Sequence, residues 1–318
     1  MFTNLKELIA SMPSEEQCRE YMEKARWGES PFCPHCSATK PYKLKDGKSY
    51  RCSSPKCRKD FTVTVGTVFE NSKVKLSSWL MAAYILGGHK KGISSIQLAK
   101  DIGVTQKTAW FINHRLRFAM ADPSPVPLNN IVEIDETYIG GKMENMNKGR
   151  RKKIRESGKD NKTAVMGIVE RGGSARLTVI GKKTFKELVR ENVLPTANLM
   201  TDSHNGYVGL DKEFSSHESV NHSEDEFKRG QVYTNSVEGF FSIFSRTIFG
   251  IYHQVSPKHL HRYCTETAYR YNFRKMTDKE RFERTISNVE GRLKYNTLID
   301  KKPNKPAAPP YYPDVTLE

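Results

Sequence analysis

The sequence predicts an α/β protein in which a small cysteine-containing module and a helical segment precede a domain built around a central sheet. Four cysteines fall close together within the first 60 residues, and residues 77–120 repeat their apolar side chains with the period of a helix. From residue 131 the repeat becomes that of strands. The expected domains are 1–72, 73–120 and 131–298, with a proline-containing linker at 121–130 and a disordered tail at 299–318.

The charge of the chain favours a polyanionic partner. Lys and Arg number 52 and Asp and Glu number 36, which gives a formal net charge of +16. A field of this sign attracts nucleic acid first and an anionic membrane surface second. The mean hydropathy is −0.65, and no apolar run reaches the roughly 18 residues that a membrane span needs. The N-terminal stretch also lacks the pattern of a signal peptide, so we expect a cytoplasmic protein associated with the nucleoid.

Four cysteines have the spacing of a zinc ribbon. Cys33 and Cys36 form one pair, Cys52 and Cys57 form the second, and short strand-like fragments surround them. Two thiolate pairs on hairpin turns can close a tetrahedral site around one structural Zn²⁺. A pair of disulfides is the alternative, but it needs an oxidising compartment, and nothing in the sequence indicates export.

Residues 73–120 follow the pattern of a helix-turn-helix. Ser94 and Thr105 are favourable N-caps for two consecutive helices, and Gly103 supplies the turn between them. The second helix carries polar and basic side chains beside an apolar stripe, as a helix that enters the major groove of DNA does. An ordinary helical hairpin has the same period. The side chains expected to contact DNA are Gln106 and Lys107 at the bases and Arg115 or Arg117 at the backbone.

From residue 131 the chain alternates strands and helices. The stretch IVEIDETYIGGK at 131–142 is typical of a strand, Gly172-Gly173 marks a hairpin, and an apolar run ends at Asp202. One helix separates the hairpin from this run and another follows it, which predicts a mixed α/β domain with a central sheet. The basic insert 142–162 is too polar to bury. We expect it to be a mobile loop that either touches phosphate or stays solvated.

The predicted strand IVEIDETYIGGK contains three carboxylates in a strongly basic chain. Strand alternation places Glu133 and Asp135 on one face and Glu136 on the other. A buried carboxylate is costly, and a divalent cation offsets that cost. Asp202 and Glu238, from two other elements, could converge on Asp135. Two Mg²⁺ or Mn²⁺ ions about 3.5–4 Å apart would suit such ligands and an in-line phosphoryl transfer. The alternative is three unrelated acids on solvated faces.

Five short words occur in order along the chain: VEIDETYIGGK, TDSHNGY, NHS at 221–223, TNSVEGFFS and GIYHQVSPKHLHRYCTETAYRYNFR. Together they resemble the DDE transposases of bacterial insertion sequences that are related to the Merlin superfamily. The resemblance extends from about residue 15 to residue 275. It implies a ribonuclease-H-like catalytic domain preceded by a zinc ribbon and a helix-turn-helix.

The resemblance also implies an activity. Such a transposase binds the terminal inverted repeats of its own element, hydrolyses a phosphodiester at each end and joins the 3′-OH to target DNA. The route would be cut-and-paste or replicative, and we expect a homo-oligomer on the DNA. Two other classes stay open. One is a DNA-binding regulator that uses the ribbon and the helix-turn-helix alone, and the other is a metal-dependent nuclease on the same fold.

The family pattern carries over onto particular residues. Asp135 and Asp202 match its first two metal ligands, and both Asn235 and Glu238 match the word that contains the third. Because two divalent ions bring four positive charges, a third carboxylate helps to hold them. We therefore expect Glu238 to bind metal and Asn235 to cap the helix that begins at Ser236.

Three positions depart from the family pattern. Tyr233 stands where the family has His, Phe241 where it has Trp, and Ser245 where it has Lys. The last change removes a basic residue that would contact phosphate. Arg246, next to it, becomes the candidate for that contact with DNA.

Overall fold

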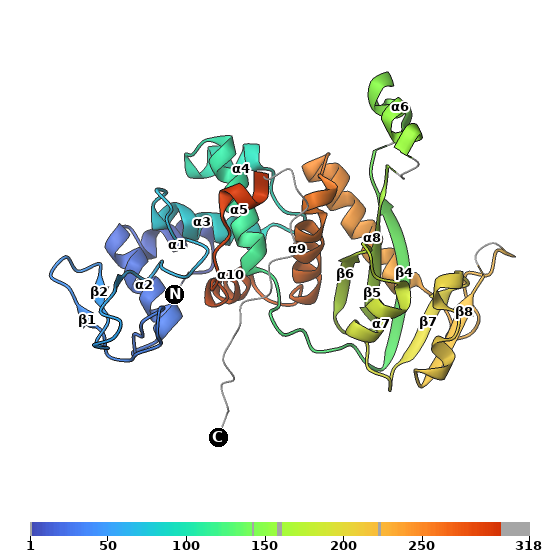
Figure 1. Ribbon diagram of the computed structural model, residues 1–318, viewed down its shortest axis with the longest axis horizontal. Helices are drawn as coiled ribbons and strands as arrows, with labels where there is room; N and C mark the ends of the chain where they lie inside the picture. Colours follow the sequence, from blue (N-terminus) through green and yellow to red (C-terminus); the bar gives the residue numbers. More distant parts are fainter. Residues whose placement is uncertain (1, 142, 158–160, 222–223, 300–318) are drawn as a thin grey trace. The chain divides into compact units, whose positions relative to one another are not determined.

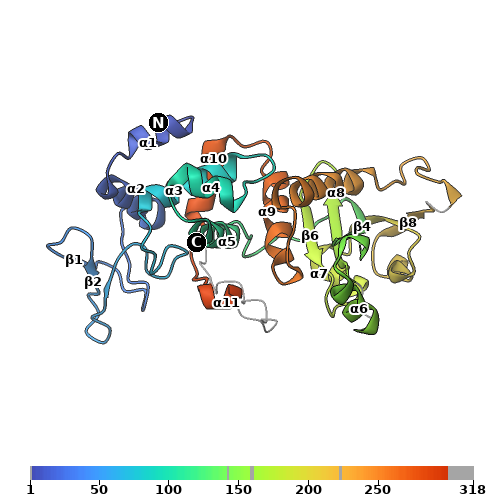
Figure 2. The same ribbon diagram turned by 90° about the horizontal axis from the view of Figure 1, so that it is seen from above.

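The computed structural model describes residues 2–141, 143–157, 161–221 and 224–299 (Figures 1 and 2). The chain divides into two compact units, which are described separately. The first contains the described parts of Met1–Pro123 and Phe273–Glu318, and the second is Ser124–Asn272. Among the described helices, none has the length and hydropathy needed to cross a bilayer. The expected disordered tail lies outside the described residues, except for its first residue.

The first unit begins with two helices and a ribbon of short strands. The elements are α1 (Leu5–Ser11), α2 (Glu15–Trp27), β1 (Tyr42–Lys43), β2 (Tyr50–Arg51) and β3 (Asp60–Phe61). The strands pair antiparallel in the order β1-β2-β3. The rings of Trp27, Tyr50 and Phe61 lie with centroids 5.3 to 6.0 Å apart. This aromatic core compensates for the shortness of the strands, because each ring buries a large apolar area.

Three further helices follow in the first unit: α3 (Leu76–Gly88), α4 (Ser95–Ile102) and α5 (Gln106–Ala119). Both predicted N-caps are confirmed, because the Ser94 hydroxyl accepts from the amide of Gln97 and the Thr105 hydroxyl from that of Thr108. Gly103 ends α4 with a left-handed φ of 67°, a conformation that glycine adopts at little cost.

The last described helices, α10 (Asp278–Ser287) and α11 (Tyr295–Ile299), belong to the first unit. Phe282 of α10 is fully buried, and its ring contacts those of Phe2, Tyr21 and Tyr84. The second unit therefore ends at residue 272, whereas the third domain predicted from the sequence extends to residue 298. Helical period alone could not reveal this division, because the partners of α10 lie about 200 to 280 residues earlier in the chain.

The second unit contains a mixed five-stranded sheet. Its strands are β4 (Ile131–Ile139), β5 (Thr163–Glu170), β6 (Ala175–Val179), β7 (Asn198–Asp202) and β8 (Ser216–Val220). Their order is β6-β5-β4-β7-β8; β5 runs antiparallel to β4 and β6, whereas β7 runs parallel to β4 and β8. If the five strands are numbered in chain order, with β4 as the first, their order in the sheet is 3-2-1-4-5. The second of them, β5, runs opposite to its neighbours. This is the ribonuclease-H-like arrangement that the resemblance implied.

Helices cover both faces of this sheet (Figure 2). α7 (Phe185–Asn192) packs on the face that contains Val132 and Ile134 of β4. α8 (Asn235–Thr247) and α9 (Leu260–Asn272) pack on the opposite face. Alternation along β4 therefore divides its side chains between two apolar cores, as a strand covered on both faces requires.

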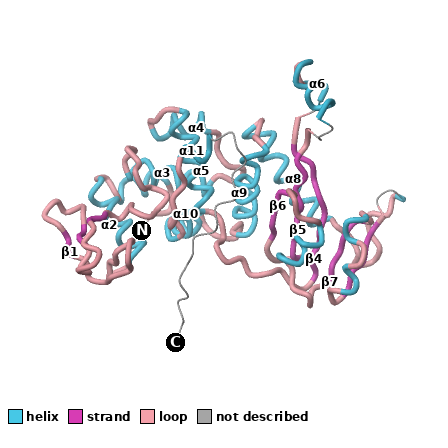
Figure 3. Tube along the Cα trace, viewed as in Figure 1, coloured by secondary structure: helices cyan, strands magenta, loops and turns pink. Residues whose placement is uncertain are grey.

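The described part of the basic insert is helical, and the prediction of a loop is wrong there. It contains a 3₁₀ turn at Met143–Asn145 and α6 (Lys148–Ser157), which stands beyond the ends of β4 and β5 (Figures 1 and 3). Lys and Arg are good helix formers, and Lys152 and Glu156 form an ion pair one turn apart. Residues 142 and 158–160 of the predicted insert lie outside the described residues.

Candidate functional site

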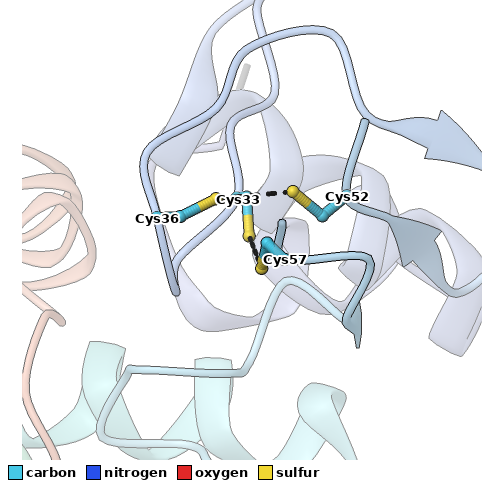
Figure 4. A group of neighbouring side chains, drawn as sticks. All are labelled: Cys33, Cys36, Cys52 and Cys57. Atoms are coloured by element: carbon cyan, nitrogen blue, oxygen red, sulfur yellow. Dashed lines mark hydrogen bonds between the residues drawn. The ribbon is translucent and has the colours of Figure 1, made fainter. Parts of the chain in front are cut away.

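The four predicted cysteine ligands lie together in the ribbon of the first unit (Figure 4). Their sulfur atoms are all within 4.8 Å of one another. Cys33 Sγ is 3.9 Å from Cys57 Sγ, and Cys36 Sγ is 3.4 Å from Cys52 Sγ. Zn–S bonds of about 2.3 Å at tetrahedral angles separate two sulfurs by about 3.8 Å. The donor set and its spacing therefore fit one Zn²⁺.

Backbone amides support this cysteine cluster. The amide of His35 donates to Cys33 Sγ at 3.4 Å, and the amide of Ser54 donates to Cys52 Sγ at the same distance. Each donor lies two residues after its cysteine, so the two turns have equivalent geometry. Hydrogen bonds to sulfur stabilise the thiolate form, which is the form that binds metal.

A second cluster lies on adjacent strands of the sheet in the second unit. β4 and β7 are parallel, and their register pairs Ile134 with Thr201, so the next residues, Asp135 and Asp202, lie side by side. Glu136 completes the cluster: each of the three acids has a carboxylate oxygen within 4.8 Å of the other two. Sequence alternation had placed Glu136 on the opposite face from Asp135. Its side chain nevertheless reaches the cluster at the end of the short strand β7.

The electrostatic environment of the cluster is unfavourable for negative charge. Burial raises the pKa of Asp135 to about 7, and the charges of Asp202, Glu136 and Glu238 add to this effect. Burial is also the main cause that raises the pKa of Glu136. Among the residues that the structure describes, no Lys or Arg forms an ion pair with Asp135, Glu136 or Asp202. A divalent cation would supply the positive charge that this site lacks.

Two residues that follow β7, His204 and Tyr207, orient the side chain of Glu136. The Tyr207 hydroxyl donates to Glu136 Oε2 at 3.0 Å, and His204 Nε2 lies 4.0 Å from Glu136 Oε1. The amide of Gly206 donates to His204 Nδ1 at 3.0 Å. Tyr207 is buried, so its hydrogen bond holds one carboxylate oxygen of Glu136 in place. The sequence alone indicates no role for Tyr207 or Glu136, although both lie in the words VEIDETYIGGK and TDSHNGY.

The two candidates for the third ligand lie in the first turn of α8. Glu238 is exposed and accepts a hydrogen bond from the Thr234 hydroxyl at 3.0 Å. Its charge contributes to the raised pKa of Asp135, so the two carboxylates are near each other, but Glu238 is not in the tight cluster of three. Asn235 is the first helical residue, and Thr234 occupies the N-cap position without a side-chain cap. The prediction that Asn235 caps the helix is wrong.

The carboxylate of Glu133 takes the place of that cap. It is fully buried and accepts hydrogen bonds from the amides of Ser236 and Val237, at 2.6 and 3.1 Å, and from the Ser236 hydroxyl. Arg171 Nε donates to the same carboxylate at 2.6 Å. Glu133 thus satisfies amides that the start of α8 would leave unbonded, and its charge favours the positive end of the helix dipole.

Arg171 and Gly167 fix α8 further against the sheet. Arg171 also donates to the carbonyl oxygens of Gln231 and Tyr233 and lies 3.6 Å from the centre of the Tyr233 ring. Gly167 pairs with Asp135 in the β4–β5 register, and a Cβ there would lie 2.6 Å from the Phe241 ring of α8. Glycine therefore allows α8 to approach the strand that contains Asp135.

Comparison with known proteins agrees with this geometry. A family model described as an ISXO2-like transposase domain matches residues 127–272, and a model described as a transposase zinc-ribbon domain matches residues 13–60. The chain therefore contains a transposase domain and a transposase zinc ribbon of the insertion-sequence type. It is also similar to an uncharacterized protein in transposable element ISH50 of Halobacterium salinarum, with 27% identity over 253 residues, which cover 75% of this chain and 84% of that protein. The acid cluster lies inside the matched transposase domain, and the four cysteines lie inside the matched ribbon.

Of the residues predicted to contact DNA in this transposase, some are exposed and others are buried. Gln106 and Lys107 are exposed at the start of α5, where Gln106 donates to the Ser95 hydroxyl and Lys107 lies over the Tyr295 ring. Arg246 is exposed in the last turn of α8. These three side chains are accessible to DNA in the described structure, and their role stays a prediction.

Arg115 and Arg117 of the transposase are buried, and the prediction that either binds the DNA backbone is wrong. The Arg115 guanidinium donates to the carbonyl oxygens of Val68 and Leu293 and lies 4.3 Å from the centre of the Phe111 ring. Burial lowers the pKa of Arg115 to about 10, which still leaves it charged at neutral pH. Its partners come from distant parts of the sequence, so a local helical pattern could not identify them.

Proposed function

We propose that this transposase binds the terminal inverted repeats of its insertion sequence, hydrolyses phosphodiester bonds at the ends and transfers the 3′-OH strands to target DNA. The observation that supports this most strongly is the cluster of Asp135, Glu136 and Asp202, because three close carboxylates with no Lys or Arg partner among the described residues suit divalent metal ions. Asp135, Asp202 and Glu238 would hold two Mg²⁺ or Mn²⁺ ions. When bound, such ions stabilise the charge that develops on the attacking and leaving oxygens of the phosphodiester.

The residues of the chain have separate roles in this proposal. Asp135 and Asp202 lie on strands of the sheet, which gives them fixed positions. Glu238 reaches the same region from α8, and its position depends on the bonds that Glu133 makes to the start of that helix. Glu136, held by Tyr207, offers one remaining oxygen to a metal ion. Glu238 is preferred to Asn235 because a charged carboxylate balances the ions better than a neutral amide does.

The proposed DNA contacts lie in both units. Gln106 and Lys107 would read bases of the terminal repeat from the N-terminal turn of α5, as the recognition helix of a helix-turn-helix does. Arg246 would bind phosphate, and the zinc ribbon would support end recognition. In this proposal the protein acts as a homo-oligomer on DNA, because two ends must be processed together, and it works in the cytoplasm in association with the nucleoid.

Cleavage and strand joining by single variants test this proposal. Duplexes that carry the ends of the element are incubated with protein and Mg²⁺, and pre-cut ends are used to measure joining alone. Asp135→Asn, Asp202→Asn and Glu238→Gln should each lose both reactions, whereas Asn235→Ala should keep measurable activity. An inactive Asn235→Ala beside an active Glu238→Gln would make Asn235 the third ligand. Cleavage without joining would indicate a nuclease, and binding without either reaction a regulator.

A further inference from the structure

A cavity of about 530 Å³ lies in the second unit, at the end of β4 away from its start at Ile131. Two segments that are distant in the sequence form its walls. One is the base of the β4–β5 insert, with Gly141, Asn145 and Asn161, and the other follows α8, with Phe249 and Gln254. None of these residues belongs to the acid cluster. The volume lies within the range of about 300–1,000 Å³ that is usual for small-molecule sites in proteins.

The cavity walls are polar but almost without charge. Amide side chains come from both segments, and aliphatic side chains such as Ile139 and Leu260 complete the lining. Among its described lining residues there is no Lys, Arg, Asp or Glu. A phosphate group would need cations, so this chemistry does not suit it. A nucleobase has neutral donors and acceptors at its edge and an apolar face, and amide side chains pair with base edges through two hydrogen bonds.

The backbone along one wall has two rare conformations. The π-helix Ile248–Tyr252 follows α8 directly, and such segments occur often at functional sites. His253 then has φ 57° and ψ −55°, and the Gln254 amide donates to the Tyr252 carbonyl at 2.6 Å. This is a γ-turn of the rare form with positive φ, which is strained for a residue with a side chain. Strain of this kind persists where the surrounding structure requires a particular shape.

The surroundings of the cavity suit a nucleic acid strand. α6, on the same insert, presents the exposed cations Lys152, Lys153 and Arg155. Phe249, at the cavity, is 49% exposed and offers an aromatic face on which a base can stack. Ile139 lies four residues after Asp135 on β4, which is about 13 Å along the strand. That length equals about four base-pair steps of B-form DNA.

We infer that this cavity accepts one nucleobase that has left the DNA duplex, within about four nucleotides of the phosphodiester at the acid cluster. The inference rests on the proposed function for its position relative to the cleaved bond. The amides of the cavity would contact the edge of the base, Phe249 would stack on it, and the cations of α6 would bind the adjoining phosphates.

Binding to bulged DNA tests this inference without knowledge of the terminal repeat. The probes are 40-bp duplexes with one unpaired thymidine, the same duplexes with an abasic residue in its place, and fully paired duplexes. Affinities of the full-length protein are measured by fluorescence anisotropy in Ca²⁺. We expect the thymidine bulge to bind at least 10-fold more tightly than the abasic bulge. Equal affinities would overturn the inference.

Filling the cavity provides the matched variant. Gly141 lines the cavity, and among the described residues a Cβ at this position meets only the methyl group of Met146, at 3.8 Å, so Gly141→Leu is expected to fold. This variant should lose the preference for the base and bind paired duplex as before. Gly181→Leu is the control and should keep the preference, because Gly181 lies outside the cavity and a Cβ there has no described neighbour within 4 Å. A preference that survives in Gly141→Leu would contradict the inference.

The two proposals can fail separately. If the wild-type protein cleaves element ends but does not distinguish the two bulges, the cavity inference is wrong and the proposed function stands. If it distinguishes them through Gly141 but cleaves no DNA, base binding at the cavity stands and the catalytic proposal fails.

Discussion

Glu133→Gln removes the negative charge shared by Arg171 and the first turn of α8, while it keeps the size of the side chain. Neutralising one member of a buried ion pair usually costs about 3–5 kcal/mol. Arg171 is 14% exposed and keeps two carbonyl acceptors and the Tyr233 ring, so we expect a smaller cost than this, about 2–3 kcal/mol. For a domain of about 150 residues this corresponds to a fall in Tm of about 4–12 °C.

Glu133→Gln should also raise the Mg²⁺ concentration that DNA cleavage requires, and loss of stability alone should not account for this change. The amides of Ser236 and Val237 lose a charged acceptor, so the turn that contains Glu238 is held less firmly near Asp135. We expect half-maximal DNA cleavage to require at least 10-fold more Mg²⁺, at a temperature where the variant is fully folded. Thermal melts and Mg²⁺ titrations of cleavage measure the two effects independently.

The second unit offers a matched control for this experiment. Glu266 and Arg270 form another buried ion pair, one turn apart on α9, and both side chains are almost inaccessible. Glu266→Gln should lower the Tm by a similar amount without a change in the Mg²⁺ requirement. Equal shifts of the Mg²⁺ requirement in both variants would refute the positioning role of Glu133, and so would a loss of stability alone in Glu133→Gln.

Three further predictions follow from the two sites. In metal-free protein, burial raises the pKa of Asp135 from its ordinary value of 3.8 to about 7, so the folded state binds the extra proton and loses stability as the pH rises from about 4 to 7. Asp135→Asn should remove this slope and stabilise the protein at pH 8 by about 2–4 kcal/mol, as urea unfolding would measure. Cys36→Ser should reduce the zinc content from about one per chain, measured by metal analysis of reduced protein, and a fully folded zinc-free wild type would refute the structural role. Gly167→Ala should displace α8, because the new Cβ meets the Phe241 ring at 2.6 Å, with a cost of about 1–3 kcal/mol in urea unfolding and a loss of cleavage; unchanged unfolding and cleavage would show that the contact is relieved elsewhere.

Local features of the structure could be predicted from the sequence because their causes are local. Ser94 and Thr105 cap helices because their hydroxyls reach amides three residues ahead. The cysteine pairs have a spacing that fixes two turns, whatever the rest of the fold. The strand character of residues 131–139 also depends on a short-range pattern, and it gave the position of Asp135 correctly within β4.

Features that depend on distant partners could not be predicted in this way. The basic side chain of Arg115 was interpreted as a phosphate contact, whereas carbonyl groups of Val68 and Leu293 bind it in the interior. Asn235 has the chemistry of an N-cap, but a carboxylate from Glu133, about 100 residues earlier, already bonds the amides of that turn. In each case the side chain has the chemistry for the predicted role, but a partner from a distant part of the sequence excludes that role.

The three acids of β4 show how the fold separates a structural carboxylate from carboxylates that suit metal. The negative charge of Glu133 is balanced by Arg171 and by two amides at the positive end of α8. Arg171 would therefore repel a metal cation at this position. Among the described residues, Asp135 accepts a hydrogen bond only from the amide of Glu136, at 2.7 Å, and the charges that act on it are those of Asp202, Glu136 and Glu238.

The repulsion at Asp135 is tolerated because the rest of the domain holds the acids in place. Gly167 lets α8 approach closely, and the bonds of Glu133 to the first turn of α8 oppose its movement away from the sheet. A site that relaxed to separate its charges would be less suited to divalent ions. The balanced acid therefore stabilises the arrangement in which the unbalanced acids remain close enough to bind metal.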